Sequence, residues 1–195
     1  MRYRHLSGFT LIEVLVVISI ISVLTSLVLA GIWIARLRCL EALAKTEVSG
    51  MKLALEGYVQ DEAVYPGEAD PPEGRVPEEQ NQFPELYEAI CGARAPSGRG
   101  GRSSPYVNLP SERLAVWDDG LGAYRQATRG EIRDPETPKL LLDPFQNPYV
   151  YRLNRGRPPK PHAMNPAGAD LYSLGLNEVD DTVAQAEGSD DIGNW

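Results

Sequence analysis

The chain is poor in the residues that build most enzyme active sites and metal centres. Its 195 residues contain two cysteines and two histidines. Cys39 and Cys91 lack the spacing of a zinc site or a redox motif, and we expect two free thiols. His5 lies near the start and His162 in a proline-rich stretch, so neither fits a catalytic triad or a metal-histidine motif. The sequence therefore predicts a protein that is not an enzyme.

Positive charge is also scarce. Nineteen Lys and Arg stand against 27 Asp and Glu, which gives a net charge of −8. Binding to nucleic acid needs clustered Lys and Arg that neutralise phosphates, so this balance argues against a nucleic-acid partner. The length suits one membrane helix and one modest domain.

Charge is almost missing from residues 9–35, where Glu13 is the one ionisable side chain. About 20 apolar residues cross a bilayer as a helix, so this run is long enough to span one. A plain membrane anchor does not explain the acid, because a carboxylate at a helix centre costs roughly 3 kcal/mol of insertion free energy. An acid inside a membrane usually serves a function and needs a partner.

The natural partner is a free amine. If a peptidase cuts after Gly8, Phe9 gains an α-amino group about one helical turn from Glu13, and a neighbouring subunit could place its amine against that carboxylate. An ordinary signal peptide is the alternative. Its apolar core has 7–15 residues with small residues before the cut, whereas here the run is about twice as long and the small residue precedes it.

The stretch Gly-Phe-Thr-Leu-Ile-Glu-Val-Leu, residues 8–15, resembles the class III signal of type IV pilins and pseudopilins. The resemblance implies that a prepilin peptidase removes the leader 1–8 and methylates Phe9, and that Glu13 sets the stacking register in a filament. Loss of Arg2 and Arg4 with the leader would change the net charge from −8 to −10. It also implies a single-pass protein of the inner membrane, with residues 9–35 in the bilayer and the domain 36–195 in the periplasm.

Periodicity predicts that the helix continues to about residue 62. Apolar residues recur there at steps of three and four, which gives one stripe for a domain to cover: Leu37, Leu40, Ala44, Val48, Met51, Leu55 and Tyr58. Residues 66–105 contain seven prolines and six glycines, which indicates an irregular insertion. Within it, the spacing of Phe83, Leu86, Tyr87 and Ile90 predicts a short helix near 84–91.

The rest of the chain reads as short strands. Residues 106–109, 114–117, 149–153 and 170–174 are rich in aromatic and branched side chains and are bounded by turn formers. We therefore expect an α+β fold, in which a long N-terminal helix packs against a small antiparallel sheet, as in type IV pilins.

Two C-terminal motifs are similar to those of the major pseudopilin of type II secretion. The first, Asp-Pro-Phe-Gln-Asn-Pro-Tyr at 143–149, departs from the family by Phe145 in place of Trp and Gln146 in place of Gly. The second is Asp-Leu-Tyr-Ser-Leu-Gly at 170–175. Together with the N-terminus, the resemblance covers roughly residues 1–65 and 139–195.

The C-terminal tail contains seven acids and no bases from residue 170 onward. Such a run is usually a solvated tail, but clustered carboxylates also suit Ca²⁺, which takes six to eight oxygen ligands. The family resemblance favours calcium and implies a loop at 174–191. It assigns the carbonyl oxygens of Leu174 and Val179 and the side chains of Asn177, Asp190 and Asp191 as ligands, with Asn177 where the family usually has Asp.

The resemblance thus implies a structural subunit of a type II secretion pseudopilus that helps to drive protein export across the outer membrane. The resemblance implies as partners further copies of the chain in a helical filament, minor pseudopilins, the prepilin peptidase and the inner-membrane secretion platform. An extracellular type IV pilin for adhesion, motility or DNA uptake is the alternative, although many such pilins close a C-terminal disulfide and no cysteine follows Cys91. A monomeric single-pass protein is the third reading.

Overall fold

The computed structural model describes residues 10–68, 81–91, 105–134, 136–154, 163–184 and 189–195. It divides into two compact units, Met1–Leu40 and Glu41–Trp195. The helix α1, Leu11–Glu62, contributes to both. Among the described residues it is the one helix long and apolar enough to cross a membrane. In the first unit its large apolar side chains are exposed, as for Leu27 and Leu29, which suits contact with lipid or other helices.

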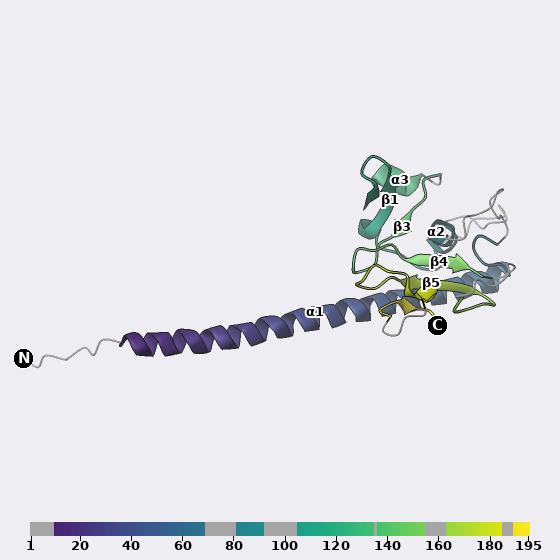
Figure 1. Cartoon of the computed structure of the whole chain (residues 1–195). Helices are drawn as coiled ribbons and strands as arrows, with labels where there is room; N and C mark the ends of the chain where they lie inside the picture. The colour runs from purple at the N-terminus through teal and green to yellow at the C-terminus, as the bar shows by residue number, and fades with distance from the viewer. Residues whose placement is uncertain (1–9, 69–80, 92–104, 135, 155–162, 185–188) are drawn as a thin grey trace, which may run out of the picture. The chain divides into compact units, whose positions relative to one another are not determined.

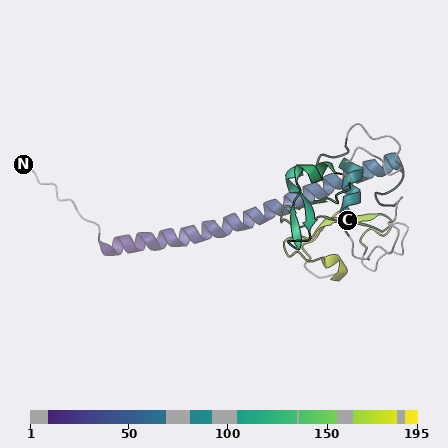
Figure 2. The ribbon, with the colours of Figure 1, turned by 90° about the horizontal axis from the view of Figure 1, so that it is seen from above.

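In the second unit, α1 buries the stripe that its periodicity predicts. Val48, Met51, Leu55 and Tyr58 are each at most 4% exposed, and they share one core cluster with side chains of α2 and the strands that lie along this part of the helix (Figure 2). Burying each such side chain contributes roughly 1.5–3 kcal/mol to the free energy of unfolding. This burial gives the second half of α1 its place in the domain.

A polar contact also joins α1 to the rest of the domain. The Glu47 carboxylate accepts hydrogen bonds from the Tyr149 hydroxyl at 2.7 Å and from Arg113 Nη1 at 3.1 Å. Tyr149 is fully buried, while the side chains of Glu47 and Arg113 are mostly covered. The pair therefore lies in a partly dry setting, where a charge-assisted hydrogen bond is stronger than at an open surface.

The strands form two three-stranded antiparallel sheets (Figure 1). The first has the order β2-β1-β3, with β1 at Leu114–Asp118, β2 at Ala123–Gln126 and β3 at Leu140–Leu141. A short 3-10 turn, Ser111–Arg113, precedes β1, and the five-residue helix α3, Arg129–Arg133, follows β2. Thr128 and Glu131 form a capping box that starts α3, because each side chain binds a backbone N–H of the other residue.

The second sheet has the order β4-β5-β6, with β4 at Val150–Leu153, β5 at Ala169–Ser173 and β6 at Ile192–Gly193. All five residues of the central strand β5 are buried. A short helix, α4 at Asp181–Ala184, lies between β5 and β6 in the chain. The long helix and the antiparallel strands together confirm the predicted α+β fold.

Three details differ from the sequence-based expectations. Residues 106–109 form no strand. Instead, the backbone N–H groups of Tyr106 and Val107 donate to Ile90 O at 2.8 and 3.4 Å and close the end of α2, Phe83–Cys91. The strands divide into two sheets rather than one, and five short elements lie where no helix or strand was predicted: β2, β3, β6, α3 and α4. The helix α2 itself lies where the short helix was expected.

The two cysteines are free and differ in environment. Cys39 is exposed on α1, whereas Cys91 is half-buried at the end of α2. The Cys91 thiol donates to Val107 O at 3.4 Å. Burial raises the pKa of Cys91 to about 11, so this thiol is almost entirely protonated near neutral pH.

Candidate functional site

The first candidate site lies at the start of α1. Thr10 precedes the helix, and both its backbone N–H and its hydroxyl donate to Glu13 Oε2, at 2.8 and 2.7 Å. The Glu13 N–H donates back to Thr10 Oγ1 at 3.3 Å. This arrangement is a capping box, which satisfies backbone groups that the first turn of a helix leaves without partners.

The capping box was missed in the sequence, although the spacing Thr-x-x-Glu at 10–13 is its usual signal. Gly8 and Phe9, the predicted processing residues, lie outside the described residues. The structure describes one chain, and at this end it describes residues from Thr10 onward. The pairing of Glu13 with another subunit therefore stays a prediction, and in this chain the carboxylate binds its own helix start.

The second candidate site begins at the turn between β3 and β4. Asp143 is fully buried, and its Oδ1 accepts from the N–H groups of Phe145 and Asn147, both at 2.8 Å. Its Oδ2 accepts from the Ser173 hydroxyl at 2.5 Å. Burial raises the pKa of Asp143 against these hydrogen bonds, which lower it. One carboxylate thus shapes the turn and ties it to the end of β5.

The same turn reaches the predicted calcium loop. Asn147 Nδ2 donates to Gly175 O at 2.8 Å, and the Gly175 N–H donates to Ser173 Oγ at 3.1 Å. Gly175 has a φ of +67°, and an added Cβ would lie 2.5 Å from Asp190 O. Only glycine fits there without a shift of the backbone, because other residues meet both the left-handed strain and that close contact.

Asp190 and Asp191 bind two different parts of the loop. Asp190 Oδ2 accepts from the N–H groups of Leu176 and Asn177 at 2.6 and 3.0 Å. Asp191 Oδ2 accepts from the Asp181 N–H at 3.0 Å. Segments separated by about ten residues in the chain are therefore held together through these two carboxylates.

The second carboxylate oxygen of each aspartate, Oδ1, makes no comparable contact among the described residues. Asp190 Oδ1 and Asp191 Oδ1 are buried, and neither has a hydrogen-bond partner within the described part of the chain. A buried polar atom without a partner costs roughly 1–3 kcal/mol. Burial first, and then the negative charge of Asp180, raises the pKa of Asp191 to about 6. The loop thus holds two carboxylate oxygens that a cation would satisfy.

The remaining predicted ligands lie in the same loop. The Asn177 side chain accepts from the Val179 N–H at 2.8 Å and donates to Asp181 Oδ2 at 3.0 Å. Leu174 directly precedes Gly175. The structure therefore brings Asn177, Asp190 and Asp191 into one loop through these contacts. Among the described residues, no group of three or more His, Cys, Asp or Glu is arranged as a metal centre; the predicted set has two carboxylates and relies on amide and carbonyl oxygens.

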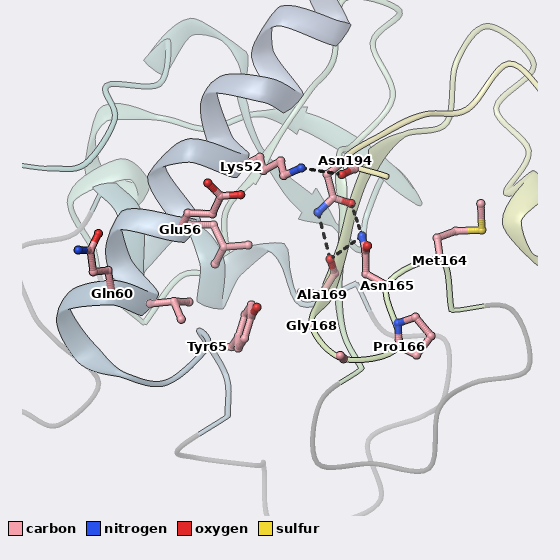
Figure 3. Close-up of a pocket in the computed structure, with 13 residues that line it drawn as sticks. Lys52, Glu56, Gln60, Tyr65, Met164, Asn165, Pro166, Gly168, Ala169 and Asn194 are labelled. Atoms are coloured by element: carbon pink, nitrogen blue, oxygen red, sulfur yellow. Dashed lines mark hydrogen bonds between the residues drawn. The ribbon is translucent and has the colours of Figure 1, made fainter.

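A separate pocket of about 570 Å³ lies between α1 and the segment 164–169 (Figure 3). Lys52 Nζ donates across it to Asn194 O at 3.2 Å. The Asn194 side chain accepts from Asn165 Nδ2 and from the Leu171 N–H, both at 3.1 Å, and donates to Ala169 O at 3.1 Å. These bonds fasten the chain end to β5, three residues after the Asp190–Asp191 pair.

Comparisons with known proteins address both ends of the chain. Residues 4–29 match the family model described as the prokaryotic N-terminal methylation motif. Over all 195 residues, and over 99% of the relative's length, the chain is 26% identical to a type II secretion system core protein G from Pseudomonas aeruginosa. The similarity thus extends beyond the motif to the C-terminal loop, and the motif itself includes Gly8, Phe9 and Glu13.

Proposed function

We propose that this chain is a pseudopilin of type II secretion, a structural subunit of a pseudopilus that helps to drive protein export across the outer membrane. The full-length similarity to a type II secretion core protein carries this conclusion. The methylation motif at the start of an apolar helix supports it. The chain is anchored in a membrane through α1 and assembles with other components of the secretion system.

The finer steps are proposals of their own. A prepilin peptidase cuts between Gly8 and Phe9 and methylates the new amine. The N-terminus then faces the cytoplasm and the domain lies in the periplasm, with copies of the chain, minor pseudopilins and the inner-membrane platform as partners. The match at residues 4–29 supports the processing step. Intact-mass measurement of the mature chain should show loss of residues 1–8 plus one methyl group, whereas a start near Ala30 would indicate an ordinary signal peptide.

Glu13 is proposed to pair with the Phe9 amine of a neighbouring subunit. An unpaired carboxylate in lipid is costly, so pairing favours one stacking register. The capping box with Thr10 is compatible with this role, because a carboxylate accepts several hydrogen bonds at once. Glu13 then both starts the helix and fixes the neighbour.

Complementation tests this function. In a host that lacks its own core protein G, the parent chain should restore secretion and yield filaments after mild crosslinking. Glu13→Ala should still enter the membrane but assemble and secrete poorly. Glu41→Ala, which removes an exposed carboxylate farther along α1, is the matched control and should behave as the parent. Normal filaments from Glu13→Ala would refute the pairing, and no rescue by the parent would argue against the subunit role.

The C-terminal loop is proposed to bind one Ca²⁺. Support comes from the two buried oxygens, Asp190 Oδ1 and Asp191 Oδ1, which lack partners within the described residues. The Asn177 side chain and the carbonyl oxygens of Leu174 and Val179 complete the proposed set. Oxygen donors of this kind suit a hard cation with flexible geometry. When bound, the ion neutralises the carboxylates and fixes the loop against β5.

A further inference from the structure

Asp180 lies among the proposed calcium ligands but is already fully engaged. Its Oδ2 accepts from Arg152 Nη2 at 2.5 Å and from the Tyr172 hydroxyl at 2.9 Å. Its Oδ1 accepts from the Thr182 N–H at 3.2 Å and from the Thr182 hydroxyl. Both carboxylate oxygens of Asp180 are thus hydrogen-bonded, one to the sheet and one to α4. Asp190 and Asp191 differ, because the Oδ1 atom of each has no hydrogen-bond partner among the described residues.

Arg152 brings a positive charge that the tail itself does not contain. No Lys or Arg occurs from residue 170 to the C-terminus, while four aspartates of the loop, at 180, 181, 190 and 191, repel one another. Arg152 lies on β4, and its guanidinium pairs with Asp180 with side-chain exposures of 19% and 21%. Its Nε is buried with no hydrogen-bond partner in the described part of the chain, so Asp180 is the contact that compensates its burial.

The guanidinium is also held in orientation. Its central carbon lies 5.6 Å from the centre of the Tyr172 ring, and the Tyr172 hydroxyl binds the same carboxylate oxygen. A planar guanidinium over an aromatic face loses little further freedom when it binds a carboxylate. Arg152 and Tyr172 lie on the adjacent strands β4 and β5. Together they form a preorganised binding site for the Asp180 carboxylate.

We propose that Arg152 is a positioning residue for the calcium loop: it binds Asp180, keeps that acid out of the ligand set and thereby fixes its two backbone neighbours for the ion. Val179 on one side supplies a proposed carbonyl ligand. On the other side, the Asp181 N–H holds Asp191 Oδ2 at 3.0 Å. This inference rests on the proposed calcium site and adds the residue that sets its geometry from outside.

Removal of Arg152 changes the affinity for Ca²⁺ in opposite directions under a positioning role and under a purely electrostatic role. If Arg152 acted only as a nearby positive charge, its removal would raise the affinity for Ca²⁺, because a cation near the site repels the ion. If it positions the loop, its removal leaves the partly buried Asp180 carboxylate without its positively charged partner, loosens the loop and lowers the affinity. Residues that orient metal ligands from outside typically change metal affinity about 10–100-fold when they are replaced.

The test is calcium titration calorimetry on the full mature chain in detergent. Arg152→Met should weaken Ca²⁺ binding about tenfold or more, and Asp180→Asn should leave it nearly unchanged. The double variant Arg152→Met/Asp180→Asn should bind no more tightly than Arg152→Met, because the contact that fixes the loop is absent from both. Arg125→Met, which breaks an ion pair in the other sheet, is the matched control and should bind as the parent does.

Hydrogen exchange in chelator gives a readout that needs no ion. Arg152→Met should speed exchange at the amides of Leu176, Asp181 and Thr182. Tighter calcium binding by Arg152→Met, or a loss of binding by Asp180→Asn equal to that by Asp190→Asn, would overturn the positioning role. A parent chain that binds no Ca²⁺ would instead overturn the proposed site, so the two failures are distinguishable.

Discussion

At the scale of single residues, Gln146 has a backbone conformation that its side chain does not favour. Its φ is +77° and its side chain is exposed. The left-handed conformation brings Cβ close to the following carbonyl and costs roughly 1–2 kcal/mol for a residue other than glycine. The turn keeps it because Asp143 O accepts the Gln146 N–H at 3.1 Å while Asp143 Oδ1 binds the residues on either side.

Gln146→Gly should therefore stabilise the chain. The relief of strain exceeds the entropy that glycine adds to the unfolded chain, so we expect a gain of about 0.5–1 kcal/mol in the free energy of unfolding. Thermal unfolding of the full chain in detergent measures it. Gln146→Ala keeps the Cβ and should show no such gain, and a Gly variant no more stable than the Ala variant would refute the strain.

At the scale of elements, the β1–β2 hairpin and α3 are held together by Arg125. Its guanidinium binds Asp118 Oδ2 at 2.8 Å and Glu131 Oε1 at 2.6 Å. The hydrogen bond from Arg125 first, and those from Thr128 next, lower the pKa of Glu131 to about 2. Trp117 and Tyr124 pack edge to face on the same hairpin, with ring centres 5.1 Å apart. These contacts join β2 and α3, whose residues are mostly exposed, to β1, which contributes to the core.

The ion pair between Arg125 and Glu131 predicts that the stability of the fold depends on pH. Because the folded pKa of Glu131 lies below its ordinary value of 4.5, its contribution is present above about pH 4.5 and is lost as the pH falls toward 2. The free energy of unfolding of the parent should thus fall more steeply with decreasing pH than that of Glu131→Gln, which unfolding curves at several pH values measure. Glu112→Gln, an exposed acid before β1, controls for general charge, and equal acid slopes in the parent and Glu131→Gln would contradict the prediction.

At the scale of the whole molecule, the proposed ion links the chain end to the body of the domain. A ligand that binds only the folded form stabilises it, by about 2.7 kcal/mol at 100 times its Kd. Chelator should therefore lower the melting temperature of the full chain and expose the loop 174–191 to protease. Ca²⁺ should reverse both effects, and Mg²⁺ should do so poorly because it demands tight octahedral geometry.

Two variants sharpen the calcium prediction. Asp190→Asn/Asp191→Asn should abolish the response, whereas Asn177→Asp should strengthen it by adding a negative ligand. Glu41→Gln/Glu56→Gln removes the same charge from exposed positions on α1 and should keep the response of the parent. If neither chelator nor Ca²⁺ changes the melting curve, the tail is a solvated acidic segment that binds no calcium.

How much the sequence predicts depends on whether a feature is local. The end of α1 at Glu62 and the strands β1, β4 and β5 follow from periodicity and turn formers, and the structure confirms them. Strand β2 has an exposed, mixed pattern, and β3 and β6 have two residues each, so tertiary pairing defines them. Residues 106–109 have strand-like composition but are used to close α2.

The candidate site divides in the same way. Gly8, Phe9 and Glu13 follow from a local motif, and the acidic residues of the loop follow from composition and resemblance. Which carboxylate oxygens are already hydrogen-bonded depends on the tertiary structure. The pairing of Asp180 with Arg152 joins residues 28 positions apart, and the partner-free Oδ1 atoms of Asp190 and Asp191 depend on how the loop folds back on itself. No spacing rule predicts these contacts.

The contrast between the two thiols makes the native chain ready for site-selective labelling. Maleimides react with thiolates, and the pKa of about 11 leaves Cys91 with almost none near neutral pH. Cys39 is exposed on α1 in the described structure. A single spin label or fluorophore can thus be attached to α1 without engineered cysteines. Distances between labels on neighbouring subunits would then report the rise and rotation of an assembled filament directly.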